Sequence, residues 1–246
     1  MTLIPRPFPA ALPHGDLTEV LPGIHLVTGT MAMQGALPVR FSRNMTIVRE
    51  GERLVLVNSV RLDDRRLAAL DALGKVTDVV RIAANHGMDD PFYKDRYGAK
   101  VWAVQGQRYT AGFDHGAETT YFAPDVEMDA TTELPLAGAR LHLIHSTPTE
   151  ALLLLDRHQG VVVSGDCLQN WSVDPYFSFF AGVMMRLMGF IKPYNIGPAW
   201  LKNGKPPTAE LRAILGLPFT NVIPAHGSPV LGEAVARYRP AIDRLR

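Results

Sequence analysis

The chain has 246 residues, of which 47% are hydrophobic and 20% are charged, and its formal net charge is +1. This length is sufficient for one large domain with a sizeable core, while the balanced charge excludes a broad basic surface of the kind that binds nucleic acid. A single cysteine, Cys167, excludes an internal disulfide framework and is typical of a reducing compartment.

The first third of the chain predicts strands followed by a helix. The N-terminal stretch MTLIPRPFPAALPHG has prolines where a signal peptide requires an apolar helix, so we expect a cytoplasmic protein. Short β-branched runs at 24–28, 46–49 and 54–57 predict strands, and the turn EGER joins the last two as a hairpin. Leucines near helical spacing then predict a helix over 61–74 that ends at Gly74.

Two further strands, predicted at 79–83 and 100–104, flank the stretch AANHGMDDP at 83–91. We therefore expect this stretch to lie on the loop between them, and loops at strand ends often carry functional residues. Taken alone, a histidine followed by Asp-Asp-Pro is typical of a solvated turn. Its role depends on which residues the rest of the chain brings to it.

The second half of the chain repeats this alternation. Strands are predicted at 139–145, 151–156 and 160–166, with RHQG as the turn between the last two. A helix is predicted over 208–217 and a final strand within 219–229. The chain then continues into a C-terminal helix that Pro240 is expected to interrupt or kink.

Five imidazoles or carboxylates follow these strands directly or within a few residues. They are His86, Asp90, His145, Asp166 and His226. Because strand ends converge at one edge of a layered fold, we expect these side chains to share one cleft. Neutral imidazole and carboxylate are the ligands that suit zinc, iron and manganese. For any one of these residues a packing or capping role is the common alternative, and only their joint order favours a metal site.

In the order of these parts the chain resembles the metallo-β-lactamase superfamily. That family shows a hairpin, a strand ending in His-x-His-x-Asp-His, a later strand ending in His, a Gly-Asp pair and a final His before the C-terminal helix. The counterparts are HGMDDP at 86–91, His145 in LIHSTP, Asp166 in SGDCL and His226 in PAHGSP. The resemblance implies an α/β fold of four layers, an αββα sandwich in which two sheets pack between outer helices, and a single domain over 1–246.

The chain departs from the family pattern at three places. Met88 and Pro91 stand where the family has its second and third histidines of the first motif. Proline offers no side-chain donor, and a thioether is a poor ligand for a hard or borderline divalent ion. The sequence Asn58-Ser59-Val60 also replaces the family's Asp-Thr-Gly, and the loss of such a supporting carboxylate commonly weakens metal affinity by about 10- to 100-fold.

The resemblance implies two metal positions. One ion would keep His86, His145 and Asp166. The other would keep Asp90, His226 and the same Asp166. Because each position has lost one imidazole, we expect at most one divalent ion, held by His86, His145 and Asp166, with zinc favoured, iron or manganese as alternatives, and no metal as the remaining one. Asp90, where it is not a ligand, is expected to act as a catalytic general base that orients a water molecule.

The stretch 171–200 lies outside the family scheme and predicts an apolar insertion. It is rich in phenylalanine and methionine and is too short and interrupted to cross a membrane, which takes about 20 apolar residues. We therefore expect no transmembrane segment. The alternatives are a buried helix, a homodimer contact, a membrane-surface contact, or a lid that forms a wall of the cleft and suits an apolar small-molecule substrate.

Three classes of function are open from the sequence. The first is a metal-dependent hydrolase of an ester, thioester, lactone or amide, which the five ligand-type residues support. The second is a catalytically silent binding protein that kept the fold and an apolar pocket, which Met88, Pro91 and Asn58 support. The third is an iron protein of redox or oxygen chemistry, which ranks last because the sequence shows no flavin or second redox domain. The sequence favours the hydrolase.

Overall fold

The computed structural model describes residues 8–33, 39–110 and 120–245. In this part of the chain the first sheet has seven strands, in the order β1 (Thr18–Leu21), β2 (Ile24–Met33), β3 (Val39–Glu50), β4 (Arg53–Val57), β5 (Lys75–Arg81), β6 (Lys100–Val104) and β7 (Val126–Met128). The second has four, in the order β13 (Asn221–Pro224), β10 (Val161–Ser164), β9 (Glu150–Leu155) and β8 (Ala139–Ile144). A short pair joins β11 (Leu168–Gln169) to β12 (Asn195–Ile196).

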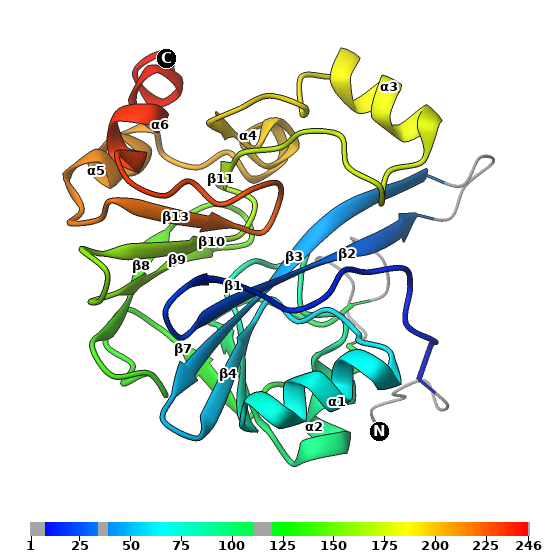
Figure 1. Cartoon of the computed structure of the whole chain (residues 1–246). Helices are drawn as coiled ribbons and strands as arrows, with labels where there is room; N and C mark the ends of the chain where they lie inside the picture. The colour runs from blue at the N-terminus through cyan, green and yellow to red at the C-terminus, as the bar shows by residue number, and fades with distance from the viewer. Residues whose placement is uncertain (1–7, 34–38, 111–119, 246) are drawn as a thin grey trace.

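The helices of the described residues are α1 (Asp64–Leu73), α2 (Asp90–Tyr97), α3 (Phe179–Leu187), α4 (Pro198–Gly204), α5 (Thr208–Ala213) and α6 (Ala234–Asp243). The two sheets pack on each other through an apolar core that includes Val48 and Leu153. Leu70 of α1 and Tyr93 of α2 pack on the outer face of the first sheet, while α5 and α6, the latter through Ile242, pack on the second (Figure 1). The expected four-layer αββα sandwich is confirmed.

Local signals explain most element boundaries. Asp63 caps the start of α1 by accepting a hydrogen bond from the backbone N–H of Arg66, and Gly74 follows its last residue. The helix predicted over 208–217 is shorter, because α5 passes into a 3₁₀ turn at Ile214–Gly216. Pro240 does not end α6, in which Tyr238 and Ile242 are buried against the core.

Helix α2 is the main element that the sequence analysis missed. The stretch around His86 was expected to be loop throughout, but α2 begins at Asp90 with Pro91 in its first turn. Proline is compatible with this position because the first turn of a helix does not use its backbone N–H. Gly98 closes the helix in the left-handed conformation.

Helix α3 stands beside the ends of β2 and β3, away from α5 and α6 (Figure 1). Its first residue follows Ser178, which accepts a hydrogen bond from the backbone N–H of Ala181 and so caps the helix. No helix among the described residues combines the length and apolar character that a membrane span needs.

Asn44 on β3 connects the first sheet to the end of β13. Its side-chain Nδ2 donates to the carbonyl oxygens of Pro224 at 2.9 Å and Gly227 at 2.7 Å. Its Oδ1 accepts from the hydroxyl of Thr28 at 2.8 Å. Because Pro224 and Gly227 flank His226 in the sequence, Asn44 fixes the loop that carries this histidine.

We predict that Asn44→Ala lowers the free energy of unfolding by about 3 kcal/mol, because it leaves one buried and one partly buried carbonyl group without their donor. Urea unfolding followed by circular dichroism measures this change. Asn195→Ala is the matched control, since its amide donates to Gly189 O in an exposed position and is expected to cost less than about 1 kcal/mol. Equal losses in the two variants would contradict a special role for Asn44.

Candidate metal centre

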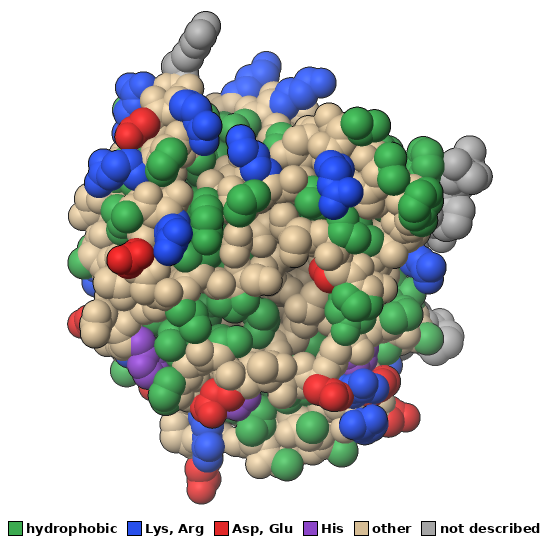
Figure 2. Space-filling view, turned by 45° about the horizontal axis from the view of Figure 1, so that its top comes forward, with side chains coloured by type: hydrophobic (Ala, Val, Ile, Leu, Met, Phe, Trp, Pro, Cys, Tyr) green, Lys and Arg blue, Asp and Glu red, His purple; other side chains and the backbone are tan. Residues whose placement is uncertain are grey.

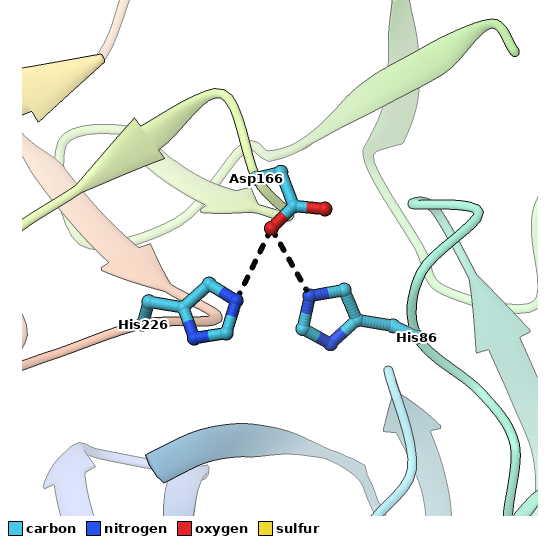
Figure 3. Close-up of side chains that lie close together, drawn as sticks. All are labelled: His86, Asp166 and His226. Atoms are coloured by element: carbon cyan, nitrogen blue, oxygen red, sulfur yellow. Dashed lines mark hydrogen bonds and ion pairs between the residues drawn. The ribbon is translucent and has the colours of Figure 1, made fainter. Parts of the chain in front are cut away.

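Three residues at strand ends come together at one edge of the two sheets. His86 follows β5, Asp166 follows β10 and His226 follows β13, and all three are buried. Each offers one ligand atom, and these atoms lie within 4.8 Å of one another. Figure 3 shows the two imidazole rings approaching the same side of the Asp166 carboxylate.

Both rings are directed at a single oxygen. His226 Nε2 lies 3.1 Å from Asp166 Oδ1, and His86 Nε2 lies 3.6 Å from the same atom. The centroids of the two imidazoles are 5.0 Å apart. The other carboxylate oxygen, Oδ2, accepts a hydrogen bond from the side-chain amide of Asn85 at 3.1 Å. Asp166 is therefore held from both sides.

His226 is fixed on its far side by two contacts. Its Nδ1 lies 3.0 Å from the backbone oxygen of Ser42, and since a carbonyl only accepts hydrogen bonds, this nitrogen carries the proton. Trp171 stacks on the ring at 4.2 Å between centroids and donates its own N–H to Ser42 Oγ. In the neutral ring Nε2 then presents a lone pair to Asp166 Oδ1, and two such acceptors at 3.1 Å require a proton or a cation between them.

The buried environment favours the protonation states that metal ligation needs. Burial lowers the pKa of the His86 imidazole, and neither of its ring nitrogens has a hydrogen-bond partner among the described residues. Burial opposes ionisation of Asp166, but the close contacts with the His226 and His86 imidazoles outweigh it and hold the pKa of this carboxyl well below its usual range. Two imidazoles and one carboxylate with unused lone pairs fit a divalent cation such as zinc.

The structure does not bring His145 into this group. Its side chain is 67% exposed, its Nδ1 lies 2.8 Å from Glu210 Oε1, and its backbone N–H donates to Glu210 Oε2 at 2.8 Å. This two-point contact with α5 keeps the residue on the outside of the sandwich. His86 and Asp166 therefore lie together with His226, and not with His145 as expected from the sequence.

Asp90 also lies outside the group, at the start of α2. Its Oδ1 accepts from the hydroxyl of Ser59 and its Oδ2 from that of Tyr109, both at 2.5 Å. Complete burial raises the pKa of Asp90 to about 6, although these two hydrogen bonds act in the opposite direction. The expectation that all five ligand-type residues share one cleft is thus corrected for Asp90 as well, because its carboxylate holds α2 against the segments that follow β4 and β6.

Two other positions of the first motif face elsewhere. Met88 and Pro91 line a second cavity, together with Phe92, rather than the space in front of His86. Met88 therefore does not line the cavity in front of the three grouped residues.

A cavity of about 440 Å³ opens in front of the three grouped residues. One of its walls is formed by the stretch 171–200, which is one of the alternatives that the sequence left open, through Trp171, Met184, Met185, Met188, Phe190, Ala199 and Trp200. The opposite side is formed by Met31 and Phe41 of the long β2–β3 hairpin. The cavity therefore combines a polar floor with predominantly apolar walls.

Glu150 lines the same cavity and was not identified from the sequence. It is only 2% exposed, and its Oε1 accepts the backbone N–H of Cys167 at 2.8 Å, which steadies the turn that carries Asp166. Burial raises the pKa of Glu150 well above its usual range, and the nearby charge of Asp166 acts in the same direction. A charged residue directly before the apolar run ALLLL is the signal that could have revealed it.

We predict that the free energy of unfolding of Asp90→Asn increases relative to that of wild type as the pH rises from 4 to 7. A carboxyl whose folded-state pKa is raised retains its proton in the folded state while the unfolded chain loses it, so wild-type stability falls by about 2 kcal/mol over this range. Urea unfolding at several pH values measures the difference, with the exposed Asp243→Asn as the control. A pH-independent difference between Asp90→Asn and wild type would contradict the buried position of Asp90.

Comparison with known proteins identifies the fold of the chain. No family model matches the sequence, and no curated protein matches it. Among solved structures, the metallo-β-lactamase FIM-1 from Pseudomonas aeruginosa in its mono-zinc form is 15% identical, with a TM-score of 0.60 over 96% of this chain and 97% of its own.

Two further solved structures agree. A metallo-β-lactamase from Hirschia baltica is 13% identical, with a TM-score of 0.59 over 94% of this chain and 98% of its own. One from Erythrobacter litoralis is 14% identical, with a TM-score of 0.56 over 93% of this chain and 92% of its own. At these identities the likeness concerns the backbone arrangement, and it agrees with the layers described above. The chain has the metallo-β-lactamase fold.

Proposed function

We propose that this protein is a metal-dependent hydrolase that binds one divalent ion, best suited to zinc, through His86, Asp166 and His226. The observation that supports this proposal is the convergence of two buried imidazoles on one ionised carboxylate at the floor of a cavity. Such a set leaves coordination positions open on the side of the cavity. When bound, the ion would supply Lewis-acid chemistry by polarising a carbonyl group and lowering the pKa of a water molecule to about 7.

The chain's own residues would position the ligands and exclude solvent. Ser42 sets the tautomer and ring plane of His226, and Asn85 directs the Asp166 carboxylate. Such outer contacts restrict the motion of the ligands. Asp90 has no part in this proposal, because both of its oxygens already accept hydrogen bonds from other side chains.

The cavity supports an apolar acyl substrate, in the form of an ester, thioester, lactone or amide. Its walls are rich in methionine, whose unbranched side chains adapt to ligands of different shapes. An acyl chain lying between α3 and the β2–β3 hairpin would place its carbonyl group toward His86, Asp166 and His226 on the floor. The walls would thus select the substrate while the floor performs the reaction.

A catalytically silent binding protein is the second candidate. It is favoured by the position of His145 and Asp90 outside the group, which leaves three ligand-type residues together in the described part of the chain where the family pattern implies more. The two candidates differ in turnover. A zinc-loaded protein that binds acyl compounds without hydrolysing any of them would support the binding protein.

We predict that His86→Ala, Asp166→Ala and His226→Ala each lower zinc affinity by more than the roughly 10- to 100-fold that the loss of an outer contact causes. His145→Ala is expected to bind zinc like wild type, because its ring is engaged by Glu210 outside the group. Calorimetric titration of untagged protein with zinc gives affinity and stoichiometry, and circular dichroism verifies that each variant is folded.

The comparison of His145→Ala with His226→Ala tests the assignment of the metal ligands. If His145→Ala abolishes zinc binding while His226→Ala retains it, the proposed ligand set is wrong. If the wild-type protein binds no zinc, iron or manganese at all, the hydrolase proposal fails with it.

A second prediction concerns the acyl chain. With zinc-loaded protein we expect a higher kcat/KM for p-nitrophenyl octanoate than for the acetate, and Met185→Trp is expected to lower the octanoate value by about tenfold while leaving acetate nearly unchanged. Met185 is buried on the cavity side of α3, so a tryptophan at this position fills the space that the acyl chain of the ester would occupy. Val183→Trp, on the exposed side of the same helix, is the control. An equal effect of Met185→Trp on both esters would contradict an acyl site at this wall.

A further inference from the structure

Helix α3 exposes an apolar surface that the hydrolase proposal does not use. Its outward side chains and the one directly after it are Phe179, Phe180, Val183, Leu187 and Met188, which we call the α3 patch. Phe179 is 89% exposed and Leu187 is 84% exposed. Soluble proteins rarely present large apolar side chains side by side, and such a patch commonly marks a surface that another molecule covers.

The patch belongs to a well-anchored helix. Ala181 and Met185 are buried on the opposite side of α3, and Ser178 caps its first turn. The backbone N–H of Ser178 donates to the carbonyl of Arg40 on β3, which ties the helix to the first sheet. Helix α3 is therefore fixed in place, with one apolar side packed on the protein and the other exposed to solvent.

Basic residues accompany the patch. Between positions 171 and 205 the sequence has four basic residues, Arg186, Lys192, Lys202 and Lys205, and one acidic residue, Asp174. All four basic residues are exposed, and so is Arg40 beside the start of α3. Figure 2 shows hydrophobic side chains gathered on this face of the molecule with Lys and Arg side chains near them. The surface is both apolar and positively charged.

This combination distinguishes between two occupants. A second copy of the chain in a symmetric dimer would bring the patch against itself, so that the basic residues of both copies, including Arg186 and Lys192, would surround a single contact. Like charges would then face each other around the contact. An anionic lipid bilayer offers negative headgroups for the basic residues and an apolar layer for Phe179 and Leu187.

We propose that the α3 patch docks on the surface of an anionic phospholipid membrane. With nine residues, α3 is about 14 Å long and is too short to cross a bilayer, so it would lie in the plane of the interface. Met188 belongs to the exposed patch and also lines the cavity over His86, Asp166 and His226. The membrane contact is therefore continuous with the wall of the cavity.

Sedimentation with vesicles tests the proposal without substrate or metal. The full chain is mixed with vesicles of phosphatidylcholine alone, or of equal parts phosphatidylcholine and phosphatidylglycerol. We expect wild type to sediment with the anionic vesicles, and the double variant Phe179→Ser with Leu187→Ser to lower the partition coefficient by about tenfold or more. Both residues are exposed, so these substitutions leave the core intact.

Two further variants separate the contributions. Arg186→Glu with Lys192→Glu keeps the apolar side chains and is expected to remove the preference for anionic vesicles. Leu12→Ser with Leu231→Ser changes exposed leucines outside α3 and is expected to sediment like wild type.

Several outcomes would overturn the proposal. Docking through α3 is excluded if wild type does not sediment with anionic vesicles, or if the Phe179→Ser and Leu187→Ser variant sediments as wild type does. A dimer seen by sedimentation velocity that dissociates in this variant, with no vesicle binding by wild type, would assign the patch to a second copy of the chain. Because vesicle binding is measured without turnover, each of these results is independent of the hydrolase proposal.

Discussion

The contact between the Asp166 carboxylate and two imidazoles is the constraint around which this structure is arranged. Asp166 and His226 follow β10 and β13, which pair in parallel with Val163 opposite Ile223, so their strand ends lie side by side. His86 comes from the other sheet and reaches the same oxygen across the edge of the shared core. Buried acceptors this close are stable only with a proton or cation between them, so the centre is built for a positive charge.

The two aspartates of AANHGMDDP serve the fold rather than this centre. Asp89 accepts from the Arg43 guanidinium at 2.5 Å and from the backbone N–H of Arg61 at 2.8 Å. Asp90 is held by Ser59 and Tyr109. Both carboxylates therefore fasten the start of α2 to the first sheet. This arrangement explains how the stretch can differ from the family pattern at its second and third histidines while His86 keeps its place.

Helix α3 joins the two functional proposals because it is apolar on opposite sides. Its inner side packs over the cavity and its outer side faces solvent beside exposed basic residues. A helix that only closed a cavity would need one apolar side. Exposure of the second apolar side to water is unfavourable in free energy, and contact with a lipid surface would remove this exposure.

The sequence by itself determined most strands and α1, because hydrophobic periodicity, turn residues and the helix-ending Gly74 act over a few neighbouring residues. The four layers were expected from the family resemblance, since the alternation of strands and helices alone does not specify them. The sequence also identified three of the residues that meet at the centre, since strand ends fall at one edge of the sandwich. Only the tertiary structure decided which strand-end residues meet there: Glu210 holds His145 outside, Ser59 and Tyr109 engage Asp90, and Ser42 orients His226. These partners lie between 19 and 184 positions away in the chain. A polar side chain takes the partner that the packed sheets place beside it, and local sequence patterns contain no information about that choice.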